Sequence, residues 1–392
     1  MKPFEIIATS AFGIESVTAR ELTNLGYEDV MTENGRVTFR GDFADIAKAN
    51  VELRTADRVL IKLAEFRATT FEELFQGVYA VEWADILSPD AFIHVVGKSV
   101  KSTLFSVPDC QSITKKAIIE KLKLRYRKEI FPEDGAEYKI SVAILKDVAT
   151  ITLDTSGAGL HKRGYRSLAG EAPLKETLAC SLLLLSYWRG ERLLVDPLCG
   201  SGTIPIEAAM IALDMAPGMN RGFAAERWTN FDTTVFDKAR DEAKQRVKFD
   251  RDLNIYGSDI DPKAIELAMQ HAEEAGVDEY IHLKQMNVAD FASKEKYGFV
   301  VTNPPYGERL GESREAESLY RLMGKTFSKL DTWSFYIITS NPYFEKNFGK
   351  KADKRRKLYN GKLECQYYQY FGPKPPKSEN QNRRDARERI AR

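Results

Sequence analysis

The sequence predicts an α/β protein in two parts, with a small α+β module in the first half and an open α/β sheet in the second. The chain has 392 residues, which exceeds the ~250–300 residues at which a single hydrophobic core usually stops growing. From residue 193 onward, short apolar runs alternate with helical patterns, as in a parallel sheet covered by helices. The N-terminal residues lack that regular alternation.

The first domain, residues 1–67, has the order β-α-β-β-α-β, which is the ferredoxin-like plan. We expect strands at 4–9, 29–32, 36–39 and 59–66, and helices at 13–25 and 43–53. Gly26 stands where a helix C-cap glycine stands, and Asn34-Gly35 is the commonest signal for a short hairpin. The pattern indicates a fold and says nothing about function.

The second domain, residues 68–156, contains a strongly basic helix. We expect helices at 71–78 and 112–128 and strands at 92–96, 138–145 and 148–154. Residues 111–128 contain seven Lys or Arg and one acid, Glu120. Such a face suits a polyanion, and the alternative is a face that only water contacts. The residues predicted to contact phosphate are Lys115, Lys116, Lys123 and Arg127.

Residues 157–178 are predicted to link the two halves. The run 160–166 carries Lys162, Arg163 and Arg166, which we expect to touch RNA, although an ordinary surface linker explains them nearly as well. A helix is expected to start near Pro173, because proline is tolerated in the first helical turn.

A glycine-rich turn follows the apolar strand that ends at Asp196. Gly200 and Gly202 allow backbone amides to approach a ligand, and a helix begins near Thr203. The turn lacks the lysine of a phosphate-binding Walker loop, and Asp196 would repel phosphate but can bind an amino group. The amino acid end of S-adenosylmethionine therefore fits better than a nucleotide. Cys199 is expected to be a small packing residue of this turn.

Two further acids follow the next two strands. Asp259 ends the strand 255–259 and is placed for ribose hydroxyls, whereas Asp261, before Pro262, is expected to cap a helix. Asp290 follows the strand 281–285 and can accept from an adenine amine, with Phe291 able to pack beside the ring.

The tetrapeptide 303–306, Asn-Pro-Pro-Tyr, follows a buried strand and is where we expect chemistry. Pro304 and Pro305 cannot continue a sheet, so Asn303 lies at the carboxyl edge where ligands bind in open α/β sheets. The Asn303 side-chain oxygen and the Pro304 carbonyl can both accept from an exocyclic amine, and Tyr306 can stack on a base. The alternative is a proline-rich turn that only closes a strand.

The remaining segments complete the sheet and end in a basic tail. A helix at 314–330, a strand at 333–339 and a hairpin around Asn360-Gly361 are expected. Residues 349–392 contain 14 Lys or Arg against 5 Asp or Glu, and we expect residues 373–392 to be disordered. Residues 213–254 read as a helical insertion, in which Arg221 to Trp228 have no predicted role.

Composition favours a cytoplasmic protein without a membrane span or a metal. No run of ~18 apolar residues and no charged-then-apolar leader is present. The four cysteines are far apart and show no metal-ligand spacing. His161 is expected in the linker and His271 on a helix surface, so neither is a predicted catalytic base.

The ordered set of turn, acids and Asn-Pro-Pro-Tyr resembles class I S-adenosylmethionine-dependent amino-methyltransferases. The first half, with residues 156–166 at its exit, is similar to a ferredoxin-like plus THUMP RNA-binding module. Together they resemble the RlmL/YpsC family of ribosomal RNA guanine-N2 methyltransferases, in a form with one methyltransferase domain. The resemblance implies a Rossmann-like seven-stranded methyltransferase domain at 179–372, whose last strand is antiparallel. It also implies a cofactor site formed by Asp196, Cys199, Gly200, Gly202, Thr203, Asp259, Asp290 and Asn303, and a target-base site formed by Asn303, Pro304 and Tyr306.

The leading functional hypothesis is methylation of a guanine N2 amine in 23S ribosomal RNA or its large-subunit precursor. The rivals are a transfer RNA guanine-N2 methyltransferase, a DNA N6-adenine methyltransferase, and an RNA-binding or ribosome assembly protein without catalysis. RNA is the expected partner, with S-adenosylmethionine as cofactor and no metal, membrane or protein partner.

Overall fold

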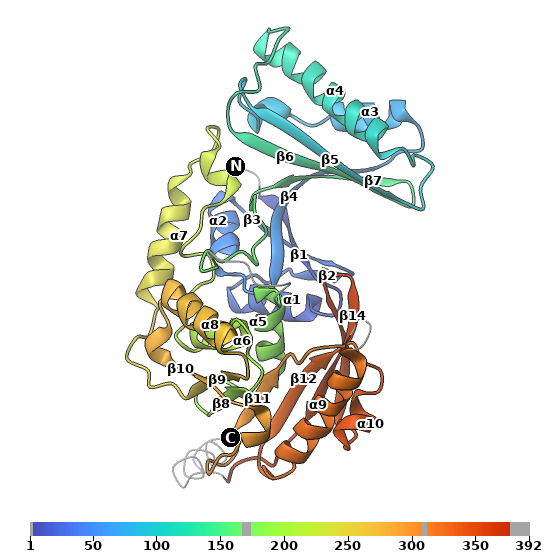
Figure 1. Cartoon of the computed structure of the whole chain (residues 1–392). Coiled ribbons are helices and arrows are strands. Elements are labelled where there is room, and N and C mark those ends of the chain that lie inside the picture. The colour runs from blue at the N-terminus through green and yellow to red at the C-terminus, as the bar shows by residue number, and fades with distance from the viewer. Residues whose placement is uncertain (1–2, 167–173, 308–311, 377–392) are drawn as a thin grey trace, which may run out of the picture.

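The computed structural model describes residues 3–166, 174–307 and 312–376, and it has an α/β architecture built on two seven-stranded sheets. The N-terminal sheet occupies the blue and teal half of Figure 1, and the C-terminal sheet lies in the green to red half. The helix expected near Pro173 begins at Glu176 as α5 (Glu176–Leu185), and Pro173 itself lies outside the described residues.

The first domain has the predicted β-α-β-β-α-β order. Its elements are β1 (Phe4–Ser10), α1 (Glu15–Asn24), β2 (Met31–Glu33), β3 (Arg36–Gly41), α2 (Phe43–Glu52) and β4 (Ala56–Arg67). Asp42 caps α2 by accepting from the backbone N–H of Asp45 at 3.0 Å, which satisfies one of the unpaired amides of the first turn. The ferredoxin-like plan is therefore confirmed.

The second module extends the same sheet. Its elements are α3 (Phe71–Tyr79), η1 (Trp83–Asp85), β5 (Phe92–Val100), α4 (Val107–Tyr126), β6 (Glu137–Leu145) and β7 (Val148–Asp154). Strand β7 pairs antiparallel with β4, which gives the continuous order β2-β3-β1-β4-β7-β6-β5. The two modules therefore share one hydrophobic core and are held in a fixed relative position.

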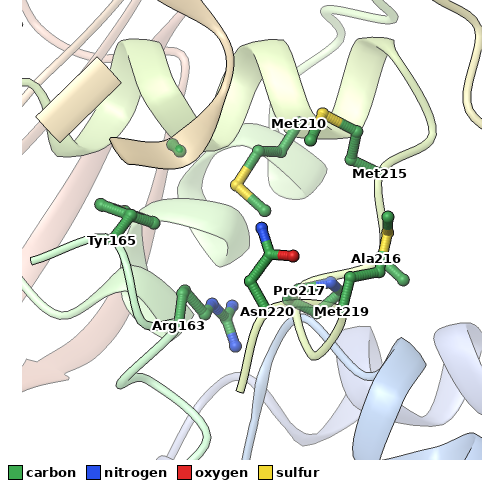
Figure 2. Close-up of a pocket in the computed structure, with 9 residues that line it drawn as sticks. Arg163, Tyr165, Met210, Met215, Ala216, Pro217, Met219 and Asn220 are labelled. Atoms are coloured by element: carbon green, nitrogen blue, oxygen red, sulfur yellow. The ribbon is translucent and has the colours of Figure 1, made fainter. Parts of the chain in front are cut away.

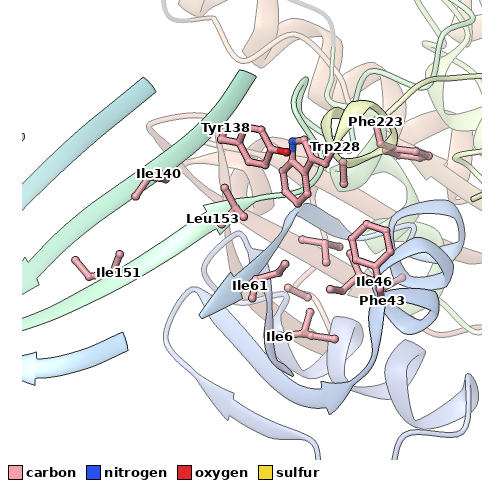
Figure 3. Packing of buried hydrophobic residues seen from close by; sticks show 14 of the residues in the cluster. Ile6, Phe43, Ile46, Ile61, Tyr138, Ile140, Ile151, Leu153, Phe223 and Trp228 are labelled. Atoms are coloured by element: carbon pink, nitrogen blue, oxygen red, sulfur yellow. The ribbon is translucent and has the colours of Figure 1, made fainter. Parts of the chain in front are cut away.

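The insertion at 213–254 joins the two halves. It contains η2 (Ala224–Arg227) and α7 (Thr234–Gln245), and Figure 3 shows Trp228 lying against Tyr138 of β6. The two rings stack with centroids 4.9 Å apart at 14°, and Trp228 Nε1 donates to the Glu137 carbonyl at 3.1 Å. Arg221 donates to the carbonyls of Gly159 and Ala158, both at 2.7 Å. Residues 221–228 therefore attach the second half to the N-terminal sheet.

The second sheet has the order β10-β9-β8-β11-β12-β14-β13. Its elements are β8 (Leu194–Asp196), α6 (Thr203–Ala212), β9 (Ile255–Asp259), α8 (Pro262–Ala275), η3 (Asp278–Tyr280), β10 (Ile281–Gln285), η4 (Val288–Asp290), β11 (Phe299–Thr302), α9 (Glu312–Phe327), β12 (Ser334–Thr339), α10 (Phe344–Phe348), β13 (Lys354–Asn360) and β14 (Leu363–Tyr370). Strand β14 pairs antiparallel with both β12 and β13, so the last strand is inserted in the reverse direction, as predicted.

The N-terminal module also contacts the last hairpin of the second sheet. Arg356 of β13 donates to the Gly13 carbonyl and to Ser16 Oγ, each at 2.9 Å. The rings of Phe12 and Tyr359 meet edge to face at 6.1 Å. The β13–β14 hairpin, whose turn follows Asn360, is therefore held by the loop that precedes α1 and by the first turn of α1.

Candidate active site

The loops after β8, β9 and β11 meet at one edge of the second sheet, because these three parallel strands are neighbours. Strand β8 lies between β9 and β11, so the chain order of the strands reverses here. This is the switch point at which open α/β sheets bind ligands. Asp196, Asp259 and Asn303 each stand at the end of one of these strands or directly after it.

Asp196 is a buried carboxylate, with 2% of its surface exposed. Thr302 Oγ1 donates to its Oδ1 at 2.6 Å, and the Leu198 N–H donates to the same oxygen at 3.2 Å. Burial raises the pKa of Asp196 to about 7, against the effect of these two hydrogen bonds, and the charge of Asp259 adds to the rise. A buried carboxylate of this kind gains most from a cationic ligand such as an ammonium group.

The glycine turn has the space that a cofactor needs. Gly200 and Gly202 have φ angles of +52° and +81°, which favour glycine. A Cβ on Gly200 would meet nothing within 4 Å, whereas one on Gly202 would lie 3.0 Å from Ala268 Cβ. The turn is thus open at Gly200 and packed at Gly202, where α6 begins. Cys199 is buried, and burial raises the pKa of its thiol, which agrees with a packing role.

Asp259 joins the first two loops. Its Oδ2 accepts from the Gly200 N–H and its Oδ1 from the Asp261 N–H, both at 3.0 Å. Each carboxylate oxygen has a further lone pair, so ribose hydroxyls remain possible partners. Asp261 accepts from the Lys263 N–H at 2.9 Å and caps α8, which confirms the prediction for this residue.

His271 is not on the surface, and the prediction for it is wrong. Its exposed fraction is 1%, because α8 turns this residue inward. Its Nδ1 lies 3.1 Å from the Ser201 carbonyl, to which an Nδ1–H donates. His271 therefore supports the glycine turn from behind.

Asp290 and Phe291 border a pocket of about 540 Å³ that also reaches Val195, Ser258 and Met286. Asp290 is exposed at the end of η4, as an adenine ligand would have to be. Phe291 is 7% exposed and packs edge-on against Phe327 and Trp333, so most of its ring belongs to the core. The pocket is large enough for a small organic ligand, but Asp196, Gly200, Asp259 and Asn303 do not line it, so of the predicted cofactor residues it supports only Asp290.

The Asn-Pro-Pro-Tyr segment is held by hydrogen bonds from both sides. Tyr306 Oη donates to Asn303 Oδ1 at 2.6 Å, and Asn360 Nδ2 donates to Tyr306 Oη at 3.4 Å. On the other side, Tyr320 Oη donates to the Pro305 carbonyl at 2.7 Å. The hydroxyl of Tyr306 thus orients the side-chain oxygen of Asn303, a contact that the sequence did not suggest. Burial raises the pKa of Tyr306, so the hydroxyl stays protonated and keeps donating.

The predicted RNA contact of Arg163 is wrong. Arg163 is 3% exposed, and its Nε lies 3.4 Å from Oε1 of Glu207, which is fully buried. Its guanidinium also donates to the Leu160 carbonyl at 2.7 Å and to the Arg54 carbonyl at 2.5 Å. A guanidinium with all these partners in the interior cannot reach RNA.

Arg166 also faces inward, which contradicts its predicted RNA contact. Its side chain is 15% exposed, forms an ion pair with Glu176 at 3.0 Å and donates to Thr203 Oγ1. Because Thr203 is the first residue of α6, Arg166 helps to position the glycine turn. Lys162 is the one predicted cation of the linker that is exposed.

The basic helix is α4, and half of its predicted contacts are already paired with acids. Lys115 forms an ion pair with Glu133 at 2.8 Å, and Lys123 forms one with Glu120 at 3.1 Å. Lys116 and Arg127 are exposed. These two remain predicted phosphate contacts with their charges available.

A second cavity lies behind the linker and is too small for a ligand. Figure 2 shows Arg163, Tyr165, Met210, Met215 and Asn220 around it. Its volume is about 10 Å³. A site of that size holds at most one water molecule.

Metal-binding and membrane-spanning features are absent from the parts of the chain that the structure describes. Residues 3–166, 174–307 and 312–376 contain no group of three His, Cys, Asp or Glu side chains arranged to hold a metal ion. Within the same ranges, no helix has the length and apolar character to cross a bilayer.

A seven-stranded sheet with a reversed last strand, a glycine turn after β8, and acids at or after the ends of β8, β9 and β10 define a class I methyltransferase fold. One family match agrees with this class, and two others cover the N-terminal half. Residues 163–369 match the "RMKL-like, methyltransferase domain", residues 5–60 the "RlmL ferredoxin-like domain" and residues 68–154 the "THUMP domain". The chain therefore belongs to the RlmL/YpsC family of THUMP-containing, S-adenosylmethionine-dependent RNA methyltransferases.

Individual relatives cover almost the whole chain. YpsC of Bacillus subtilis (strain 168), provisionally named an RNA methyltransferase, is 50% identical over 97% of this chain and 100% of its own. A Listeria monocytogenes structure, described as a predicted N6-adenine-specific DNA methylase, is 51% identical over 95% of this chain and 97% of its own, with a TM-score of 0.91. SMU.472, solved in complex with SAH, is 46% identical over 96% of this chain and 100% of its own, with a TM-score of 0.91. The cofactor is S-adenosylmethionine.

Cofactor binding is expected to weaken below pH 7. Pairing with an ammonium group requires the Asp196 carboxylate, and the pKa of Asp196 in the free protein is about 7. Affinity for S-adenosylhomocysteine, measured by calorimetry from pH 5.5 to 8.5, should therefore level off above pH 7 and fall by roughly tenfold per pH unit below it. In Thr302→Val, which lacks the hydrogen bond that favours the carboxylate, the midpoint should move to higher pH. An affinity that does not change with pH would show that Asp196 does not bind the ammonium group.

Proposed function

We propose that the protein methylates the exocyclic N2 amine of a guanine in 23S ribosomal RNA. The observation that carries the proposal is the oriented acceptor at the sheet edge, Asn303 Oδ1, held at 2.6 Å by Tyr306 Oη. It follows the strand whose last residue, Thr302, bonds to Asp196, so Thr302 links the acceptor residue to the predicted cofactor carboxylate.

Methyl transfer to this amine depends mainly on the position of the amine relative to the methyl group of the cofactor. The lone pair of a guanine N2 amine is delocalised into the ring, which makes the amine a poor nucleophile. Bound S-adenosylmethionine supplies an electrophilic methyl group with a neutral thioether as leaving group. Asn303 Oδ1 and the Pro304 carbonyl would accept from the two N–H groups and turn the lone pair toward that methyl group. The N–C bond forms as the S–C bond breaks, and the extra proton leaves the product amine to water.

Tyr306 has a second role in this proposal. Its hydroxyl uses one lone pair of Asn303 Oδ1 and leaves the other for the substrate amine. An amide held in this way cannot flip and present its NH₂ group, which would repel the amine. The ring of Tyr306 remains the proposed stacking surface for the flipped base, which offsets part of the cost of unstacking.

No strong general base is required, and the nearby histidines are poor candidates. Burial lowers the pKa of His161 to about 4, and His161 lies in the linker. His271 supports the glycine turn from behind. Positioning beside a cationic sulfonium group accounts for the rate, with proton loss after transfer.

The THUMP match and the name of YpsC support RNA as the substrate, and the RlmL ferredoxin-like match supports ribosomal RNA. Transfer RNA is the nearest rival, because the tetrapeptide is compatible with either RNA. DNA N6-adenine methylation is the activity named for the Listeria relative. A protein that only binds RNA is disfavoured, because the predicted cofactor residues are all present.

The test is nucleoside mass spectrometry on 23S ribosomal RNA, transfer RNA and DNA from cells with and without this protein, complemented by wild type or Asn303→Ala. We expect N2-methylguanosine to disappear from 23S ribosomal RNA and to return only with wild type. Loss of N2-methylguanosine from transfer RNA alone would show that transfer RNA, and not ribosomal RNA, is the substrate. Loss of N6-methyladenine from DNA would show that the protein methylates adenine and not guanine. No loss in any fraction would leave a binding role.

A further inference from the structure

The far end of the THUMP part of the sheet carries an exposed apolar patch. Phe105 is 83% exposed, Leu145 56%, Val148 40% and Val100 36%. Val100 pairs in register with Leu145, and Leu145 pairs with Val148, so three of them are neighbours across β5, β6 and β7. We call these four residues the THUMP tip. An apolar cluster that stays in contact with water is typical of an interaction site.

The loop that carries Phe105 is tied down by hydrogen bonds. The Thr103 N–H donates to Asp147 Oδ1 at 2.6 Å, and the Asp147 N–H donates to Ser102 Oγ at 3.1 Å. Ser99 Oγ donates to the Leu104 carbonyl at 2.6 Å, and Leu104 is buried beside it. The ring of Phe105 is therefore held outward by an ordered loop, and little conformational freedom is lost when a partner binds.

The surroundings of the THUMP tip are cationic. Lys98, Lys101 and Lys146 are exposed, and Arg67 pairs in register with Val148. Among the residues that the structure describes, no ion pair involves Lys98, Lys101, Lys146 or Arg67. The single acid of the two segments 98–106 and 144–149 is Asp147, whose carboxylate accepts from the Thr103 N–H.

We propose that the THUMP tip binds an unpaired segment of the RNA substrate, with one base stacked on Phe105 and phosphates contacted by Lys98, Lys101 and Lys146. An exposed aromatic ring among cations is the combination with which proteins hold single-stranded nucleic acid. The β6–β7 hairpin projects on the same side of the molecule as β14, whose hairpin adjoins the proposed target-base site (Figure 1). The inference rests on RNA being the substrate. It adds a contact surface separate from the exposed cations of α4.

The experiment compares full-length variants for binding of a fluorescein-labelled, mixed-sequence single-stranded oligoribonucleotide by fluorescence anisotropy. Phe105→Ala is expected to weaken binding roughly tenfold, and Phe105→Trp to retain it, because stacking on any aromatic face suffices. The matched control is Ile130→Ala, since Ile130 is 82% exposed in the same domain and has no predicted RNA contact. The triple variant Lys98→Ser, Lys101→Ser and Lys146→Ser should bind RNA with a weaker salt dependence. The slope of log affinity against log salt concentration should fall by the amount expected for the loss of about two to three phosphate contacts.

Equal affinity of Phe105→Ala and wild type would overturn the proposal, as would equal losses in Phe105→Ala and Ile130→Ala. Tighter binding of blunt duplex RNA with no effect of Phe105→Ala would also overturn it. Concentration-dependent dimerisation that Phe105→Ala abolishes while RNA binding stays intact would assign the patch to a second copy instead. Binding of S-adenosylhomocysteine checks that each variant is folded. If the wild type binds RNA through Phe105 but forms no N2-methylguanosine, the surface stands and the proposed function fails.

Discussion

Replacing Asn303 by Ala is expected to lower kcat for methyl transfer by roughly 10²–10³-fold, the loss seen when one aligned electrostatic partner of a transition state is removed. The reason is that Asn303 Oδ1 is the side-chain acceptor that Tyr306 Oη orients at 2.6 Å. Affinity for S-adenosylhomocysteine should fall by a much smaller factor than kcat, because Asn303 is only one of the residues predicted to bind the cofactor and the side-chain contacts of Asp196 and Asp259 do not involve it. Single-turnover methylation of RNA with labelled cofactor measures the effect.

The matched variant for this prediction is Tyr306→Phe. It keeps the ring and removes only the hydroxyl that bonds to Asn303 and to Asn360. We expect a smaller loss, roughly fivefold in kcat, since one hydrogen bond that orients the acceptor is worth about 1 kcal/mol. If Asn303→Ala methylates at the wild-type rate, the tetrapeptide only closes the strand and the amine is bound elsewhere.

Replacing Arg163 by Ala is expected to lower the free energy of unfolding by about 3–5 kcal/mol, because it leaves the Glu207 carboxylate buried without its cation. Glu207 is fully buried, and its other recorded donors are the uncharged Tyr165 hydroxyl and Cys180 thiol. Urea denaturation followed by circular dichroism measures the change. The adjacent and exposed Lys162→Ala is the control, and it should stay within about 0.5 kcal/mol of wild type.

A second substitution separates the structural role of Arg163 from an RNA contact. Adding Glu207→Gln to Arg163→Ala removes the unpaired charge and should recover part of the lost stability. RNA binding by the folded fraction of Arg163→Ala should equal that of wild type, because Arg163 is 3% exposed. Wild-type stability combined with a loss of RNA binding would restore the RNA contact that the sequence suggested.

Local structure and the candidate cofactor residues could be predicted from the sequence because their signals are local. The glycines of the turn, the Asp261-Pro262 cap and the prolines after Thr302 each restrict the backbone within a few residues. Apolar periodicity placed most strands and helices close to their observed bounds, but α4 begins at Val107 rather than at residue 112, and β5 extends to Val100 rather than to residue 96. The order of acids along successive strands then put them at one sheet edge, because parallel strands end on the same side.

What the sequence could not determine is the choice of partners between distant segments. The pattern of β4 is the same whether it ends a sheet or pairs with β7, so the continuous N-terminal sheet appeared only in the structure. The sequence around an arginine in a linker is the same whether its side chain faces water or Glu207, which lies 44 residues further along the chain. Likewise, the contact of Tyr306 with Asn360 depends on a hairpin 54 residues away. The sequence alone predicted an S-adenosylmethionine-dependent methyltransferase and the residues that we propose for its cofactor and target base. The tertiary structure decided which charges are buried and which side chain orients Asn303, because burial and hydrogen bonding depend on packing between segments far apart in the chain.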